Sequence, residues 1–200
     1  LGDILPEQVD LTFGVNVKGT LFTVQKALPL LKAGSSVILT GSTTGTMGTP
    51  AFSVYSASKA AVRNLARSWA QDLRGSGIRV NVLVPGGTET ETVMRDIGAD
   101  AMNQIGASSP LGRLGYPTET AAVAAFLASE DSSYMTGGEV FVEVRHSGEV
   151  AFIKGYAPRR KKSAAKTEKR TERPECSAPL ENYVDLHRHA AARVVLLKHQ

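Results

Sequence analysis

Two short apolar segments constrain the fold of this chain most strongly. They are SSVILTG (35–41) and GIRVNVLVPG (77–86), each a largely apolar run that ends at Gly or Pro-Gly. Runs of this length and composition are typical of strands that are buried on both faces of a parallel sheet. The sequence therefore predicts a sheet with helices packed on both of its sides.

Helical patterns surround these two strands. The clearest covers residues 54–74, and Gly75 and Gly77 mark its end. Its apolar members follow the spacing of one helix face: Val62, Leu65, Ala66, Trp69 and Leu73. The other expected elements are a helix over 7–31, a loop-rich stretch over 87–116, a helix over 118–129 and a strand over 138–143. This alternation predicts an α/β fold, a doubly wound parallel sheet in three α/β/α layers.

The predicted sheet is small, because three strands are fewer than the usual four to six. The chain opens on a helix, and its first residue is Leu1 rather than Met. We therefore expect a fragment or a processed chain. The half of a doubly wound fold that holds nucleotide phosphates is expected to lie before residue 1.

Positive charge is concentrated at the C-terminal end. Residues 151–200 hold 12 Lys/Arg against 5 Asp/Glu, and PRRKKSAAKTEKRTER (158–173) is the densest part. We expect an incomplete α/β domain over 1–143 and a basic, poorly ordered tail over 144–200. Binding of RNA or an anionic surface by this tail is an alternative. A solvated tail is favoured, because few aromatic residues lie among its basic residues, so nucleic acid is not an expected partner.

Further sequence features exclude several classes of site. Cys176 is the only cysteine, so the chain forms no intramolecular disulfide and no multi-cysteine zinc site. His187 and His189 fall in a short helix expected over 180–197, and two ligands are too few to predict a metal. The sequence contains neither an apolar run of ~20 residues nor a secretory signal pattern. We expect a cytoplasmic protein without a membrane partner.

A tyrosine and a lysine mark the candidate chemistry. Tyr55 and Lys59 lie four residues apart at the start of the 54–74 helix and share one of its faces. A nearby ammonium and the N-terminal end of a helix both lower the pKa of a phenol from its usual value of ~10. Ser42 follows the 35–41 strand, at the end where open α/β sheets bind ligands. A lone Tyr-x-x-x-Lys pair is common, but the ordered set Asn16, Ser42, Tyr55 and Lys59 is not.

With these residues in place, the sequence closely resembles the classical short-chain dehydrogenase/reductase family. The matching segments are FGVNVKGTLFTVQKALPLL, SVILTGSTTG, YSASKAAVRNLARSWAQDL, GIRVNVLVPGGTETE and GRLGYPTETAAVAAFLASEDSSYMTGGEVFVE. They cover residues 1–143 almost continuously. The resemblance implies a partial Rossmann-like fold and hydride transfer between NAD or NADP and a carbonyl or alcohol substrate.

The resemblance also implies roles for four catalytic residues. Tyr55 would be the acid/base, and Ser42 would orient the substrate carbonyl. Lys59 would lower the pKa of the tyrosine and hold the nicotinamide ribose. Asn16 would bind a water that links Lys59 to solvent. The alternative is that Asn16 is purely structural and bends its helix.

The family resemblance also implies which residues contact the cofactor and which contact the substrate. Those expected at the cofactor, besides Tyr55 and Lys59, are Pro85, Gly86, Thr88 and Thr90. Those expected at the substrate, besides Ser42, are Thr44 and Met94. A substrate lid is expected from Glu91 to Gly115, with Met94, Ile97, Met102 and Leu111 as candidate linings or plain packing residues.

The chain departs from the family pattern at both ends. TGSTTGTMG (40–48) is similar to the phosphate-binding glycine motif, but its last glycine falls one position late and it belongs to the Ser42 loop. By comparison with the family, we expect the glycine-rich turn and the residue that chooses NAD or NADP to be absent from this sequence. At the other end, FVE (141–143) is followed by VRHSGEV, which matches nothing in the family. We expect a fused or frame-shifted tail from about Val144, or read-through from an imperfect gene model.

Three functions stay open at this point. The first is an oxidoreductase that acts on a small carbonyl or alcohol substrate. The second is an inactive fragment that acts only through oligomerisation. The resemblance implies a homo-oligomer through the helices over 7–31 and 54–74, the second of which presents small residues such as Ala57, Ala60 and Ala61. The third is a binder of anions or nucleic acid that acts through the tail.

Overall fold

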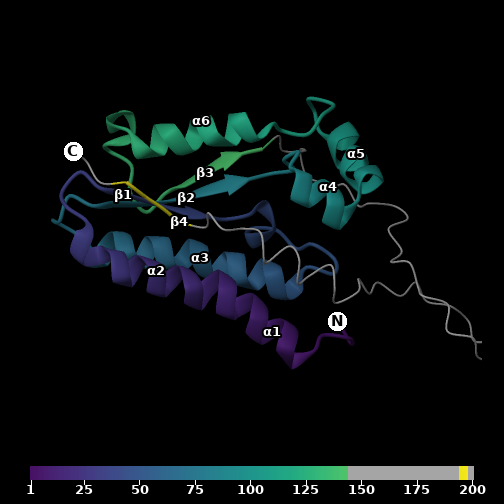
Figure 1. Cartoon of the computed structure of the whole chain (residues 1–200), viewed down its shortest axis with the longest axis horizontal. Coiled ribbons are helices and arrows are strands. Elements are labelled where there is room, and N and C mark those ends of the chain that lie inside the picture. The colour runs from purple at the N-terminus through teal and green to yellow at the C-terminus, as the bar shows by residue number, and fades with distance from the viewer. Residues whose placement is uncertain (144–193, 198–200) are drawn as a thin grey trace, which may run out of the picture.

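The computed structural model describes residues 1–143 and 194–197 as a sheet between two layers of helices (Figure 1). On one face lie α1 (Pro6–Phe13), α2 (Thr20–Ala27) and α3 (Ser53–Asp72). On the other lies α6 (Pro117–Ala128). The helices α4 (Glu91–Ile97) and α5 (Ala99–Ser108) lie beyond the ends of the central strands. The three-layer α/β/α prediction is confirmed.

The sheet has the strand order β3-β2-β1-β4. Its strands are β1 (Ser36–Thr40), β2 (Arg79–Pro85), β3 (Glu139–Val142) and β4 (Val194–Leu197). Strand β2 pairs in parallel with both β1 and β3, whereas β4 pairs antiparallel with β1. The three predicted strands form the parallel part. The fourth strand was not predicted.

The period-two alternation of β1 and β2 builds two cores. Val37 and Leu39 face α2 and α3, where they join the larger core cluster. That cluster also contains Val24, Val62, Ala66, Val80, Val82 and Val84. Ile38 and Leu83 lie on the opposite face and contact Leu127 of α6. Both faces of the two central strands are therefore buried, as their apolar runs predict.

The expected helix over 180–197 is wrong for the residues that the structure describes there. Val194–Leu197 form β4, whose residues pair with Ser36–Leu39 of β1. An open strand edge offers unpaired backbone donors and acceptors, and a Val-Val-Leu-Leu segment favours the extended conformation. The basic run over 158–173, Cys176, His187 and His189 lie outside the described residues.

The expected helix over 7–31 is interrupted. A π-helical segment, η1 (Gly14–Gly19), separates α1 from α2, and a 3₁₀ turn, η2 (Leu28–Leu30), follows α2. Glycine at both ends of η1 weakens the regular α-helix there. The remaining boundaries lie within two residues of those expected, except that the loop-rich stretch over 87–116 contains α4 and α5, a correction to the prediction. Thr90 accepts a hydrogen bond from the backbone N–H of Val93 and so begins α4.

Two classes of feature are absent from the described part of the chain. None of its helices is long and apolar enough to cross a membrane. Nor do its His, Cys, Asp and Glu residues gather in a group of three or more that could hold a metal ion.

An exposed ion pair organises the start of α6. The guanidinium of Arg113 donates to both carboxylate oxygens of Glu119, at 2.9 and 2.7 Å, and lies 4.8 Å from the centroid of the Tyr116 ring. The backbone N–H of Tyr116 donates to the same carboxylate at 2.7 Å. The hydrogen bond from Arg113 and that from Tyr116 lower the pKa of Glu119 to about 2.

This pair predicts an acid-sensitive contribution to stability. A carboxylate whose pKa is depressed by folding stabilises the protein above its unfolded pKa, here 4.5, and loses that effect as the pH falls towards 2. We therefore expect the Tm of the wild type to fall more steeply over this range than the Tm of Glu119→Gln. The difference between the two slopes is expected to be small because the pair is exposed. Calorimetric melting between pH 5 and 2 measures this. Glu91→Gln, also in the first turn of a helix, is the control, and equal slopes for Glu119→Gln and the wild type would contradict the prediction.

Candidate active site

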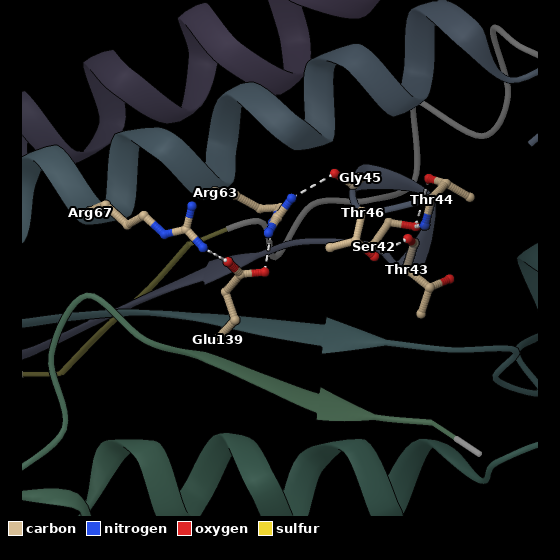
Figure 2. Close-up of polar contacts among 8 residues, drawn as sticks. All are labelled: Ser42, Thr43, Thr44, Gly45, Thr46, Arg63, Arg67 and Glu139. Atoms are coloured by element: carbon tan, nitrogen blue, oxygen red, sulfur yellow. Dashed lines mark hydrogen bonds and ion pairs between the residues drawn. The ribbon is translucent and has the colours of Figure 1, made fainter. Parts of the chain in front are cut away.

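Ser42 lies just beyond the carboxyl end of β1. Gly41 follows β1 and donates its N–H to the carbonyl of Leu83 in β2 at 2.8 Å, and a Cβ at Gly41 would approach Val82 to 2.8 Å. Ser42 is extended and caps the 3₁₀ turn η3 (Thr43–Gly45). Its Oγ accepts from the N–H of Thr44 at 3.3 Å and lies 3.0 Å from Thr44 Oγ1 (Figure 2). The predicted pair Ser42 and Thr44 is therefore brought together.

Tyr55 and Lys59 lie in the first two turns of α3. The Lys59 side chain is buried, with the residue only 5% exposed. Its Nζ donates to the carbonyl of Thr40, the last residue of β1, at 2.9 Å, and lies 5.6 Å from the centroid of the Tyr55 ring. Phe52 contacts the Tyr55 ring edge-on, with 6.2 Å between the two centroids. The structure thus places a buried ammonium between the end of β1 and the phenol.

The Ser42 turn rests directly on this part of α3. A Cβ at Gly45 would lie 3.1 Å from both the backbone carbonyl carbon and the Cβ of Lys59, so the turn approaches the helix too closely for a larger residue. Ser42, Tyr55 and Lys59 therefore come from two segments in direct contact.

Asn16 joins the same region from the π-helical segment. It is 2% exposed, and its Nδ2 donates to Ser58 Oγ at 2.8 Å. Ser58 Oγ in turn donates to the carbonyl of Tyr55 at 2.6 Å. Thr20 Oγ1 donates to the carbonyl of Asn16 at 2.7 Å. The structure places Asn16 against α3 one residue before Lys59, in an irregular helical segment of the kind often found at functional sites.

The expected cofactor residues follow the carboxyl end of β2. Because β1 and β2 are parallel, this end lies beside Ser42 at the same edge of the sheet. Gly86 donates its N–H to Val142 at 3.0 Å, and Thr88 Oγ1 donates to the carbonyl of Gly86 at 3.2 Å. Pro85, Gly86, Thr88 and Thr90 are all half-buried.

Met94 lies in the first turn of α4, where its N–H donates to the carbonyl of Thr90 at 2.9 Å. It lines a cavity of about 240 Å³ whose lining includes none of Ser42, Thr44, Tyr55 and Lys59. The other lining residues are Glu89, Asn103, Gly106, Ala107, Gly112, Arg113, Leu114 and Tyr116. The four lid candidates divide: Met102 is buried, Met94 and Ile97 are half-buried, and Leu111 is 63% exposed.

Comparison with known proteins identifies the family of this chain. The family model described as enoyl-(acyl carrier protein) reductase matches residues 1–144. An oxidoreductase of Sarocladium schorii is 56% identical over 145 residues, which are 72% of this chain and 58% of that protein. The chain belongs to the short-chain dehydrogenase/reductase family. A 3-oxoacyl-[acyl-carrier-protein] reductase of Thermotoga maritima is 37% identical over 142 residues, which are 68% of this chain and 56% of that protein.

Solved structures of the family share the fold. A short-chain dehydrogenase/reductase from Brucella melitensis matches with a TM-score of 0.67 and 29% identity, covering 73% of this chain and 60% of that one. The angucycline C-6 ketoreductase LanV, with bound NADP, matches with a TM-score of 0.66 and 29% identity. The match covers 70% of this chain and 54% of that one. The chain therefore spans between half and three fifths of the length of these relatives.

Sequence reasoning missed an ionic network beside the Ser42 turn. Arg63 and Arg67, both on α3, each contact one carboxylate oxygen of Glu139 at 2.6 Å, and Arg63 also donates to the carbonyl of Gly45 at 2.9 Å. Lys59, Arg63 and Arg67 are spaced four residues apart, and residues at this spacing share one face of a helix. The sequence therefore indicated a row of positive charges on α3. The position of Glu139, more than 70 residues later, had no such signal.

Proposed function

We propose that the protein carrying this chain is an NAD(P)-dependent oxidoreductase that transfers a hydride between the nicotinamide and a small carbonyl or alcohol substrate. The position of Lys59 carries the proposal. This buried ammonium lies between the carbonyl of Thr40 and the ring of Tyr55, on a helix in direct contact with the Ser42 turn. The oxidoreductase and ketoreductase names of the relatives support the same reaction class.

The residues at this sheet edge fit the nicotinamide end of such a cofactor. Lys59 supplies an ammonium, and Thr88 and Thr90 supply hydroxyls, beside the backbone of Pro85 and Gly86. These groups match the hydroxyl and amide groups of a nicotinamide riboside. We assign them to that end alone, because the described residues contain no glycine-rich turn between a strand and a helix that fits a pyrophosphate. When bound, the cofactor supplies or accepts the hydride.

In this proposal, Tyr55 supplies the proton and Ser42 orients the substrate. In the direction of reduction, Tyr55 donates its phenolic proton to the carbonyl oxygen, and in oxidation it removes the proton of the alcohol. Ser42 Oγ donates a hydrogen bond to the same oxygen and holds it near the phenol. The Lys59 ammonium, 5.6 Å from the centroid of the Tyr55 ring, stabilises the tyrosinate that forms when the proton is transferred. Asn16 keeps the start of α3 in place through Ser58.

Titration calorimetry with NADH and NADPH on the purified chain tests the cofactor part of the proposal. We expect micromolar binding of one of them, and a Kd that rises by ~10-fold or more in Lys59→Ala, because hydrogen bonds to a charged group contribute about 1.5–3 kcal/mol. Lys26→Ala, which removes an exposed lysine of α2, is the control and is expected to bind as the wild type does.

Two outcomes would contradict this proposal. One is a folded chain, verified by circular dichroism, that binds neither nucleotide. The other is an equal Kd for Lys59→Ala and Lys26→Ala. Either result would leave the second alternative, an inactive family member that acts through oligomerisation.

The homo-oligomer stays a prediction. It was expected through the helices over 7–31 and 54–74. On the first of these, Leu11 and Phe22 are 39% and 46% exposed, which suits an apolar contact with a second copy. Sedimentation of the purified chain distinguishes a monomer from an oligomer. The proposed binding of anions or nucleic acid by the tail concerns residues outside the described part.

A further inference from the structure

The Ser42 turn has few polar connections to the rest of the protein. Its own hydrogen bonds are short-range: Gly45 donates its N–H to the carbonyl of Ser42 at 3.0 Å, and Thr46 donates to the carbonyl of Thr43 at 3.0 Å. Across the described residues, the hydrogen bond that connects residues 42–46 to another element is the one from Arg63 Nη1 to the carbonyl of Gly45, at 2.9 Å.

The carbonyl of Gly45 needs such a donor. It ends a 3₁₀ turn, where carbonyl groups have no partner within the helix, and Gly45 is buried against Lys59. A buried carbonyl without a hydrogen bond is costly, and a charged donor satisfies it more strongly than a neutral one. Arg63 lies one helical turn after Lys59 and is therefore well placed to supply this donor.

Glu139 sets the orientation of the Arg63 guanidinium. Its Oε2 accepts from Arg63 Nε at 2.6 Å, and its Oε1 accepts from Arg67 Nη2 at 2.6 Å. The Glu139 side chain is 8% exposed, so its charge is balanced within the protein by the two arginines. Figure 2 shows Arg63 between Gly45 and Glu139, with Arg67 on the far side of the carboxylate.

We propose that Arg63, held by Glu139, is a positioning residue that fixes the Ser42 turn against α3 and thereby sets the place of the Ser42 hydroxyl relative to Tyr55. Arg63 acts through the backbone, because Gly45 N–H holds the carbonyl of Ser42. A misplacement of about 1 Å in such a group costs on the order of 100-fold in rate. The proposal rests on the proposed function, in which Ser42 orients the substrate carbonyl.

Amide hydrogen exchange tests the anchoring without any need for activity. In Arg63→Met we expect the amides of Gly45 and Thr46 to exchange ~10-fold faster or more, because a charged hydrogen bond to the turn is lost. Arg67→Met is the matched control, since it removes an equal charge and a contact with Glu139 but leaves the bond to Gly45. Arg67 is largely exposed, so its exchange effect is expected to be a few-fold at most. Equal exchange in the two variants would overturn the proposal.

Kinetics test the consequence for Ser42. Reduction of a panel of small ketones by whichever of NADH and NADPH binds more tightly is followed by the loss of reduced-nicotinamide absorbance. We expect Arg63→Met to lower kcat by ~10- to 100-fold with little change in the Kd of the cofactor, and Arg63→Lys to recover part of the loss because an ammonium reaches one of the two acceptors. A wild-type kcat in Arg63→Met, with faster exchange at Gly45, would overturn the positioning role.

Ser42→Ala separates the two proposals. If Ser42→Ala keeps full turnover, the role of Ser42 has failed, while the exchange data still decide whether Arg63 anchors the turn. If Ser42→Ala loses turnover and Arg63→Met does not, the proposed function stands and the positioning role of Arg63 fails.

Discussion

Tyr55→Phe is expected to lower kcat by ~10²- to 10⁴-fold, the usual contribution of a positioned general acid or base. The phenylalanine ring keeps the contact with Phe52 and the place beside Lys59, and only the hydroxyl is removed. Because the fold is preserved and the proton donor is lost, the loss is expected mainly in kcat and is expected to exceed any change in the Kd of the nicotinamide cofactor. Reduction of a ketone panel with the preferred nucleotide measures the first effect, and titration calorimetry measures the second.

Tyr134→Phe is the matched control for this substitution. Tyr134 is fully exposed, so loss of its hydroxyl is expected to leave kcat unchanged. The two variants together separate an effect of the phenolic proton from a general effect of removing a hydroxyl. Equal turnover in Tyr55→Phe and the wild type would contradict the role proposed for Tyr55, and with it the assignment of the acid/base.

The second large effect is expected for stability, in Arg79→Met. Arg79 is 8% exposed and lies at the start of β2. Its guanidinium donates to the carbonyl of Leu127 at 3.1 Å, to Ser132 Oγ at 2.9 Å and to the carbonyl of Ser129 at 3.1 Å. It therefore adds a charged donor to carbonyl groups at the end of α6, where a positive charge is also favoured by the helix dipole.

Arg79→Met removes all of these bonds at once. We expect the free energy of unfolding to fall by about 3 kcal/mol and the Tm by roughly 10 °C, since buried acceptors lose a charged donor. Urea unfolding and thermal melting measure the two quantities. Arg74→Met, at an exposed arginine after α3, is expected to change stability by less than about 0.5 kcal/mol. Similar losses in both variants would show that Arg79 does not hold the end of α6.

Some residues of the candidate site could be predicted from the sequence near them, and others depend on contacts between distant parts of the chain. Tyr55 and Lys59 share a helix face, and Ser42 ends an apolar strand, so their chemistry could be read from spacing and from the family resemblance. The resemblance also singled out Asn16, but its bond to Ser58 was not foreseen, because 42 residues separate the two. Met94 was assigned to the substrate from its place in the lid; it lines a cavity together with residues of α5, and its assignment to the substrate stays a prediction.

By itself, the sequence determined the three parallel strands, the layers of helices around them and the family. The reason is physical: period-two and period-3.6 burial patterns are local, and they persist in any fold that buries them. Tertiary structure alone decided the rest. An antiparallel strand at Val194–Leu197 pairs with β1, which lies far from it in the sequence. Likewise, the contact of Arg63 with Gly45 and Glu139 exists only because the sheet brings β3 under α3, a proximity that no local pattern records.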